Sequence, residues 1–174
     1  MINILKKTID FFKSKDYYEI ANFLSINECS VIIAEIEKHN FRQAQQFNDG
    51  RHNKEIFISS DFIESILENK FKGIKINFYA KPFEFYKYEI GDYITQHTDS
   101  SVMIQSNLSN YTALIYLNDN YAGGSTNLLS KKIKIKPEIG KLLLFKHNIV
   151  HEALPIVLGT KYIYRTNCVI KNSL

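Results

Sequence analysis

The sequence predicts a mainly β protein of the α+β class: an antiparallel sandwich or barrel preceded by helices. Three observations lead to this prediction. Residues 1–75 carry a helix start signal and apolar residues at helical spacing. After residue 75 the sequence changes to short runs in which apolar and polar residues alternate. Turn-forming residues separate those runs at regular intervals, as they do in antiparallel β folds.

Two helices are expected before residue 75. Ser25-Ile26-Asn27-Glu28 has the form of a capping box, in which the serine and the glutamate each satisfy a free backbone N–H. The apolar spacing that follows predicts a helix over about 26–39. A second helix is expected over 61–71, and 41–51 reads as strand and loop. The expected apolar faces are Cys29, Ile32, Ile33 and Ile36 in the first helix, and Phe62, Ile63, Ile66 and Leu67 in the second.

Five strands are expected in the second part of the chain. Each is a short run rich in β-branched, aromatic or alternating apolar residues. Turn signals such as Gly91-Asp92, Gly123-Gly124 and Gly159 lie between them, and the polar stretch 100–110 is expected to be a mobile loop. The predicted strands are 84–88, 111–118, 131–136, 141–145 and 162–170.

Length and composition predict one soluble domain. A chain of 174 residues, 45% of them hydrophobic, can bury a core, and we expect 1–75 to be a helical support for a β core formed mostly by 76–174. The net charge of +4 comes without a basic run, so a nucleic-acid partner is not favoured. The N-terminus lacks a signal-like apolar run, and we expect no membrane segment. Cys29 and Cys168 have no metal-binding spacing, which indicates free thiols in the cytoplasm.

His97, Asp99 and His151 are the candidate metal ligands and catalytic centre. Residues two apart on a strand share a face, so His97 and Asp99 can offer a nitrogen and an oxygen to one ion. His151, brought in from a distant strand, would complete a set of two histidines and one carboxylate. Such a set leaves half of an octahedral shell open and suits non-heme Fe(II) that binds a co-substrate and O2. The pattern therefore points to an oxygenase.

Lys161 is the candidate anchor for the co-substrate. With a turn between them, two antiparallel strands would bring Lys161 close to His151 and facing the same interior. A lysine buried among apolar residues needs an anion, and the far carboxylate of a dicarboxylate would supply one. Arg165 shares the strand face of Lys161 and is a rival for the same role. Either cation could instead be an ordinary solvated strand residue.

Several ordered segments resemble the prolyl 4-hydroxylase-like branch of the Fe(II)/2-oxoglutarate dioxygenases. The resemblance runs from about residue 83 to residue 170, half of the chain, and the ordered set is more specific than any one piece. Looser similarity extends to the front part, at Phe23-Leu24-Ser25 and Asp49-Gly50-Arg51-His52-Asn53. The segments that carry it are Tyr88-Glu89-Ile90-Gly91, His97-Thr98-Asp99, 112–118, Gly123-Gly124-Ser125-Thr126, Pro137-Glu138-Ile139-Gly140, His151-Glu152, Gly159-Thr160-Lys161-Tyr162 and Arg165-Thr166.

The resemblance implies a double-stranded β-helix, the jelly-roll or cupin-like fold, with its iron at one mouth of the barrel. It implies that His97, Asp99 and His151 bind Fe(II), and that Lys161 pairs with the 5-carboxylate of 2-oxoglutarate, the co-substrate used with O2. Tyr88 and Tyr116 match positions that often line the co-substrate pocket, although core packing explains each as well. The family often has Glu where this chain has Ser125 and Asp where it has Asn167, changes that touch the substrate rim rather than the iron.

Hydroxylation of an aliphatic C–H, in a protein or peptide residue such as proline, is the function that the resemblance implies. A free amino acid or another small molecule is the alternative substrate, and a barrel that binds a ligand without turnover is the alternative function. Glu152 beside His151 leaves a zinc-dependent hydrolase open as well.

Five further polar residues have less specific assignments. Arg51 and Asn53 either help to form the substrate mouth or cap a loop. His147 is placed at the rim of the site or behind the ligands, and His39 and His52 are expected on the surface.

Overall fold

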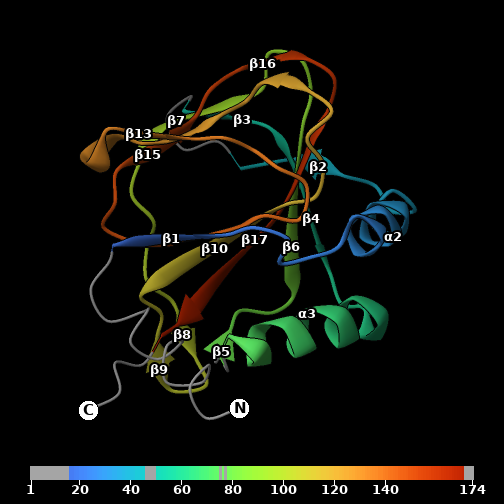
Figure 1. The fold of residues 1–174 in the computed structure, drawn as a ribbon, viewed down its shortest axis with the longest axis vertical. Helices are drawn as coiled ribbons and strands as arrows, with labels where there is room; N and C mark the ends of the chain where they lie inside the picture. Colours follow the sequence, from blue (N-terminus) through green and yellow to red (C-terminus); the bar gives the residue numbers. More distant parts are fainter. Residues whose placement is uncertain (1–15, 46–49, 75, 77, 171–174) are drawn as a thin grey trace.

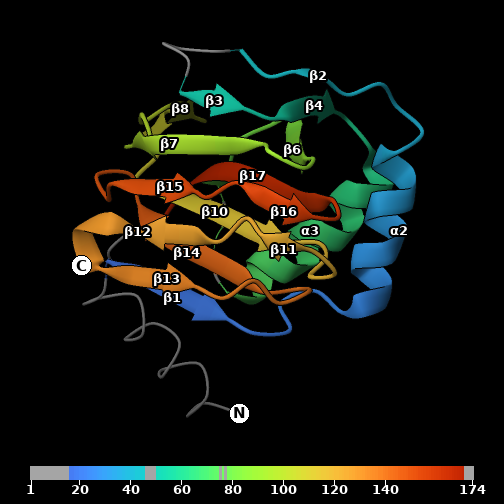
Figure 2. The same cartoon turned by 90° about the horizontal axis from the view of Figure 1, so that it is seen from above.

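Two antiparallel β-sheets face each other in the computed structural model, which describes residues 16–45, 50–74, 76 and 78–170 (Figures 1 and 2). The two sheets, with helices on the outer face of the larger one, form the double-stranded β-helix that the resemblance implied, so the predicted fold class is confirmed. The expectation about a signal sequence rested on residues 1–20, of which 1–15 lie outside the described residues. None of the helices in the described ranges is long and apolar enough to cross a membrane.

The larger sheet is antiparallel throughout and spans most of the chain. A short strand of this sheet, β5 (Phe78–Tyr79), pairs with the C-terminal end of β17. The order of its main strands is β1 (Tyr17–Ile20), β14 (Leu142–Lys146), β10 (Tyr111–Tyr116), β17 (Lys161–Val169), β6 (Phe83–Tyr88), β4 (Lys54–Ile58) and β2 (Arg42–Gln43).

The smaller sheet closes the barrel. Its strands follow the order β13 (Ile133–Ile135), β12 (Thr126–Leu128), β15 (His151–Ala153), β7 (Tyr93–His97) and β3 (Arg51–His52). Two further pairs of short strands form separate sheets. One joins two distant segments, β11 (Ala122–Gly123) and β16 (Ile156–Leu158), and the other is the hairpin of β8 (Met103–Ile104) and β9 (Asn107–Leu108).

Two helices cover the outer face of the larger sheet, α2 (Ile26–Ile36) and α3 (Asp61–Gly73) (Figure 1). The capping box forms as predicted: the Ser25 hydroxyl accepts from the Glu28 N–H, and the Glu28 carboxylate accepts from the Ser25 N–H at 2.7 Å. Helix α2 ends three residues earlier than predicted, and α3 ends two residues later. The buried face of α3 differs from the predicted one, because Ile63, Leu67 and Phe71 are buried while Phe62 is half exposed.

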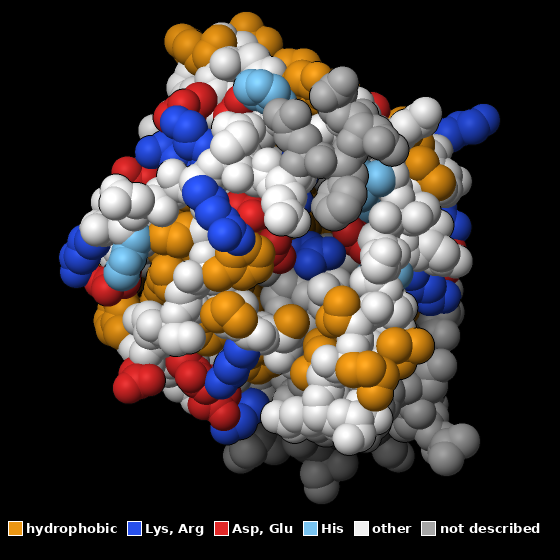
Figure 3. All heavy atoms as spheres, turned by 180° about the vertical axis from the view of Figure 1, so that it is seen from behind, with side chains coloured by type: hydrophobic (Ala, Val, Ile, Leu, Met, Phe, Trp, Pro, Cys, Tyr) orange, Lys and Arg blue, Asp and Glu red, His pale blue; other side chains and the backbone are white. Residues whose placement is uncertain are grey.

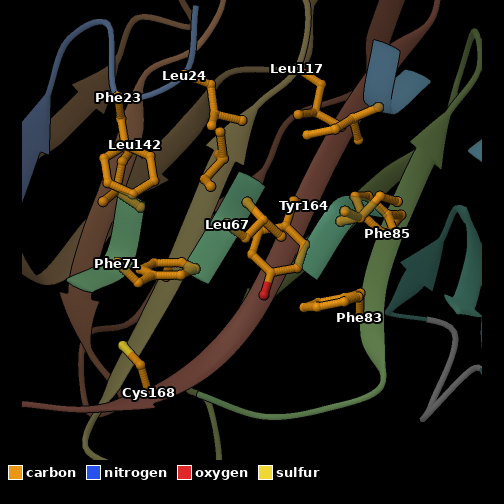
Figure 4. Packing of buried hydrophobic residues seen from close by; sticks show 14 of the residues in the cluster. Phe23, Leu24, Leu67, Phe71, Phe83, Phe85, Leu117, Leu142, Tyr164 and Cys168 are labelled. Carbon is orange, nitrogen blue, oxygen red and sulfur yellow. The ribbon is translucent and has the colours of Figure 1, made fainter. Parts of the chain in front are cut away.

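Strand β14 shows why the larger sheet has two apolar faces. Leu142 and Leu144 point outward into the core under the helices, whereas Leu143 and Phe145 point inward between the sheets. An uninterrupted apolar run is therefore what a strand buried on both sides requires. Figure 4 shows the outer core, in which rings from α3, β6 and β17 pack together around Tyr164.

Three expectations are corrected by the structure. The front part is not only helical, because β1 to β4 come from it and join both sheets. The stretch 100–110 contains the β8–β9 hairpin, whose turn residues Gln105 and Ser106 both have positive φ, as a tight hairpin turn needs. The predicted strand over 131–136 begins as a short 3-10 turn, η1 (Leu129–Lys131), and only Ile133–Ile135 forms the strand.

Candidate active site

Three adjacent strands of the larger sheet form the floor of an interior cavity. On each strand, alternate residues point inward, and the register places Lys161 beside Tyr88 and Arg165 beside both Glu84 and Leu114. The inward residues are Thr112, Leu114 and Tyr116 on β10; Lys161, Ile163 and Arg165 on β17; and Glu84, Tyr86 and Tyr88 on β6.

The cavity has a volume of about 590 Å³ and lies between this floor and the smaller sheet. Its walls combine apolar side chains such as Ile94 and Ala153 with charged ones from both sheets. Figure 3 shows a hollow on the face turned away from the viewer in Figure 1, with basic and acidic side chains together at its bottom. A cavity of this size can hold a small dicarboxylate and part of a second molecule.

His97, Asp99 and His151 come together at one end of the cavity. One ligand atom from each lies within 4.8 Å of the others, which is close enough for a single ion. Oδ1 of Asp99 lies 3.9 Å from Nε2 of His97, and Oδ2 lies 3.8 Å from Nε2 of His151. The centroids of the two imidazole rings are 4.2 Å apart. The pairing of β7 with β15 sets His97 directly opposite His151.

Each imidazole is oriented by a backbone carbonyl two residues before it. Nδ1 of His97 lies 2.8 Å from the Thr95 oxygen, and Nδ1 of His151 lies 2.9 Å from the Ile149 oxygen. A proton on Nδ1 makes each of these contacts a hydrogen bond and leaves Nε2 as the free lone pair. Burial also lowers the pKa of His151, which favours the neutral, metal-binding form.

Asp99 reaches the site from a loop, not from the strand that the sequence suggested. Strand β7 ends at His97, and the N–H of Asp99 donates to the backbone oxygen of His147 at 3.1 Å. Two side chains then hold the carboxylate: Thr112 donates a short hydrogen bond to Oδ2, and Arg165 donates to Oδ1 at 3.1 Å. The His-x-Asp spacing brings the ligands together, but through a chain bend held by these contacts.

Arg165 is occupied at this end of the cavity. Besides Asp99 it donates to Glu84 at 3.2 Å, and Glu84 also accepts from the hydroxyl of Tyr86 at 2.6 Å. Burial tends to raise the pKa of Asp99, but Arg165, His151 and Thr112 outweigh burial and lower it. Asp99 is therefore held as a carboxylate.

Lys161 lies further along the floor and has a very different environment. It is 1% exposed, and its ammonium donates to the backbone oxygen of Gly124 at 2.6 Å. The rings of Tyr88 and Tyr116 lie 5.0 and 5.6 Å from Nζ, and no carboxylate in the described part of the chain pairs with it. Burial lowers the pKa of Lys161 to about 7. Lys161 is thus a buried cation at a place where an anion can be accepted.

Gly124 makes the contact with Lys161 possible. Its φ of +59° is a conformation that glycine adopts without strain, and an added Cβ would come within 2.2 Å of the Ile156 side chain. The Gly-Gly pair is needed here because the chain must turn tightly to aim a carbonyl at the ammonium.

The sequence suggested that Lys161 and His151 lie on paired strands, and the structure shows that they do not. His151 begins β15 in the smaller sheet, whereas Lys161 begins β17 in the larger one. Both nevertheless line the same cavity, because the sheets face each other. Their shared interior is a property of the two-sheet fold rather than of a local hairpin.

The two candidate tyrosines differ in position. Tyr88 lines the cavity. Tyr116 is fully buried and not among the lining residues, and its hydroxyl donates to Thr126 at 2.9 Å. Tyr88 is therefore the one placed to contact a bound co-substrate, and Tyr116 lies behind Lys161.

The other polar residues mostly lie outside the ligand cluster. Arg51 lines the cavity, stacks on the ring of Tyr86 at 4.5 Å, and donates to Asn53 at 2.8 Å, a position that fits either of the two roles left open for it. His147 is buried beside Ser101, and its contact with the ligands is through its backbone oxygen. His39 and His52 are exposed, as expected.

Three polar residues of the site were missed in the sequence. Glu84, Thr112 and Thr126 each contact a residue that was singled out. For Glu84 a signal was present, because it shares the strand face of Tyr86 and Tyr88. A threonine that supports a ligand has no local pattern of its own and is seen only once the strands are paired.

Comparison with known proteins gives the same picture. The family model described as the 2OG-Fe(II) oxygenase superfamily matches residues 83–168. Among curated protein sequences, nothing matches. Solved structures match over nearly their whole length, at identities that establish the fold.

Three of these structures are prolyl hydroxylases. The viral collagen prolyl hydroxylase of Paramecium Bursaria Chlorella virus-1, in its 2OG complex, has a TM-score of 0.70 and 22% identity over 90% of this chain and 98% of its own. The Pseudomonas putida prolyl-4-hydroxylase has a TM-score of 0.69 and 18% identity over 96% of this chain and 99% of its own. The Trichoplax adhaerens prolyl hydroxylase, in complex with a hypoxia inducible factor peptide fragment, has a TM-score of 0.76 and 19% identity over 97% of this chain and 93% of its own.

Fold and site together define a metal-dependent oxygenase built on a double-stranded β-helix. The chain belongs to the 2OG-Fe(II) oxygenase superfamily, and it is a 2-oxoglutarate-dependent oxygenase that uses Fe(II), 2-oxoglutarate and O2. The residues present fit these groups: two Nε2 atoms and one carboxylate suit Fe(II), and a buried ammonium without a carboxylate partner among the described residues suits a dicarboxylate.

Proposed function

We propose that this protein hydroxylates an aliphatic C–H of a peptide residue, with proline as the first candidate, and that the chain works as a single oxygenase domain. The observation that carries the proposal is the convergence of two histidines, a carboxylate and a buried lysine on one cavity. When bound, Fe(II) with 2-oxoglutarate and O2 supplies the oxidising power that a C–H bond requires. The chain supplies binding, orientation and charge.

In this proposal His97, Asp99 and His151 hold the iron. The backbone carbonyls behind both imidazoles keep Nε2 aimed at the ion, so little reorganisation is needed on binding. Arg165 and Thr112 fix the carboxylate, which prevents it from turning away. The lowered pKa values of Asp99 and His151 favour the carboxylate and the neutral imidazole, the forms that bind a metal.

Lys161 anchors the far carboxylate of 2-oxoglutarate in this proposal. Arg165 is less suited to that role because Asp99 and Glu84 already take up its donors. The ammonium of Lys161 has no carboxylate partner among the described residues, and the ring of Tyr88 beside it would narrow the pocket around 2-oxoglutarate. Apolar residues such as Leu114 and Ile163 lie on the floor between the two ends and exclude water from it.

A peptide substrate is supported by the related structures. One of them is described as a collagen prolyl hydroxylase, and another is in complex with a peptide fragment. The buried free thiols Cys29 and Cys168 fit a reducing compartment, and we place the protein in the cytoplasm on that ground. A free amino acid or other small molecule is the substrate to test against a peptide.

The test is a titration followed by turnover. Purified protein is titrated with Fe(II) and 2-oxoglutarate without oxygen, then exposed to air while succinate is measured. Candidate peptides and free amino acids are screened for a mass gain of one oxygen atom. His97→Ala should abolish succinate release, and His39→Ala, which changes an exposed histidine, should not. Equal succinate from the His97→Ala protein and the parent contradicts the proposed site, and oxygen gain on free amino acids alone moves the substrate to the small-molecule class.

A further inference from the structure

The ligand carboxylate belongs to a buried chain of three charges. Arg165 lies between Asp99 and Glu84, with donor–acceptor distances of 3.1 and 3.2 Å, and the three side chains are only 15, 11 and 14% exposed respectively. Tyr86 extends the chain by donating to the other oxygen of Glu84 at 2.6 Å. Buried charges are tolerated where oppositely charged partners compensate them, and each of these three side chains has such a partner.

The sign of the charges matters for a cation bound at Asp99. Arg165 alone would cancel the charge of Asp99 and repel a divalent ion at the same oxygen atoms. Glu84 adds a second negative charge on the far side of the guanidinium, so the three groups together keep a net charge of −1. Burial makes this effect stronger than it would be in water.

We propose that Glu84 is a positioning residue for the metal site, acting through Arg165. It holds the guanidinium and offsets its charge, so that Arg165 orients Asp99 without competing with the ion. Glu84 contacts neither His97 nor His151, and this inference rests on the proposed function only in taking Asp99 as a ligand.

The experiment measures Mn(II) binding to the metal-free full-length protein by electron paramagnetic resonance, where the signal of free Mn(II) reports the dissociation constant. No turnover is required. Glu84→Gln should weaken Mn(II) binding about tenfold, which is the range seen when the partners of ligand side chains are lost. Adding Arg165→Gln to the same protein should restore the affinity to within about threefold of the parent, because the uncompensated positive charge is gone.

This recovery separates the proposal from a merely structural role. If Glu84 only stabilised the fold, a second substitution in the same cluster would weaken the protein further and could not improve metal binding. Glu37→Gln is the matched control: Glu37 pairs at 3.0 Å with Lys87, which lies on the opposite face of the same strand β6. Its Mn(II) affinity should equal that of the parent.

Two outcomes overturn the proposal. One is a Glu84→Gln protein that binds Mn(II) as tightly as the parent, and the other is a double variant that binds more weakly than Glu84→Gln alone. If Glu84→Gln does not fold, Tyr86→Phe tests the same link, with an expected weakening of about twofold to threefold from the lost hydrogen bond; unchanged affinity there also overturns it. Parent protein that binds Mn(II) no better than His97→Ala would instead refute the metal site itself.

Discussion

The two ends of the cavity treat charge in opposite ways. At the metal end, Asp99, Arg165 and Glu84 each have an oppositely charged partner within 3.2 Å. At the other end, Lys161 is more deeply buried, and its contacts in the described part of the chain are a backbone carbonyl and two aromatic rings. Arg165 and Lys161 lie on the same strand, β17, and face Glu84 and Tyr88 of the same neighbour, β6, so the difference comes from side chains and not from the fold.

The difference shows what each end requires. A fully paired network is stable as it stands and can hold a ligand in place before the metal arrives. An ammonium without a counter-ion is costly to bury, and its lowered pKa is the sign of that cost. The metal end is therefore preorganised, while the Lys161 end is completed only by an anion from solution.

The largest effect should come from removing the charge at the metal end. Asp99→Asn keeps the size of the side chain but replaces a ligand oxygen by a neutral amide. We expect 2-oxoglutarate turnover, measured as succinate, to fall by at least about a hundredfold. Asp119→Asn is the matched control, since Asp119 is in an exposed loop, where it accepts from the N–H of Ile139. Turnover that survives in Asp99→Asn places the metal elsewhere.

The second effect should come from the unpaired end. Lys161→Met removes the charge and keeps most of the volume, and we expect the 2-oxoglutarate requirement to rise by at least about tenfold, because a charge-assisted contact contributes about 1.5–3 kcal/mol. Steady-state kinetics at saturating Fe(II) give this number. If the 2-oxoglutarate requirement of Lys161→Met equals that of the parent and the requirement of Arg165→Ala rises instead, the anchor is Arg165.

Lys141 offers a control for Lys161. It is also buried, but Glu19 and Glu138 pair with it at 3.1 and 3.2 Å, and it lies outside the cavity lining. Lys141→Met should leave the 2-oxoglutarate requirement unchanged and lower the melting temperature, because two carboxylates lose their partner. Lys161→Met should raise the melting temperature of the ligand-free protein at pH 7, because a cation without a counter-ion has been removed.

The affinity for 2-oxoglutarate should also depend on pH through Lys161. In the free protein its pKa is about 7, so above pH 7 the ammonium loses its proton and binding a dianion must take one up. The dissociation constant should therefore rise above pH 7, by up to about tenfold per pH unit, and be flat below it as far as Lys161 is concerned. Calorimetry in buffers of different ionisation enthalpy measures the proton uptake. A Lys161→Met protein with the same slope would assign it to another group.

The sequence was sufficient for the fold class and for picking out His97, Asp99, His151 and Lys161, which the structure brings to one cavity. Alternation placed Lys161 and Arg165 on one face of their strand, and the capping box located the start of α2. These features are local, with periods of two residues or one helical turn, and so they can be read from one chain.

What the sequence could not give depends on pairing between distant strands. The choice between Lys161 and Arg165 turns on Glu84, which is 81 residues from Arg165 along the chain and becomes its neighbour through the β6–β17 register. In the same way, the loop position of Asp99 follows from a hydrogen bond to His147, which no spacing rule contains. Side-chain charge compensation is a property of the folded sheet.

The smallest effect should be at Tyr116, which tests how far the Lys161 end extends. Its hydroxyl donates at 2.9 Å to Thr126, a residue of the cavity wall, while its ring faces the ammonium. Tyr116→Phe keeps the ring and leaves Thr126 without its partner, so the free energy of unfolding should fall by about 1 kcal/mol and the 2-oxoglutarate requirement should change by less than about twofold. Chemical denaturation and steady-state kinetics on one preparation measure both. A large rise in the requirement would mean that the hydroxyl itself contacts the co-substrate, and the anion site would then include Tyr116 as well as Tyr88.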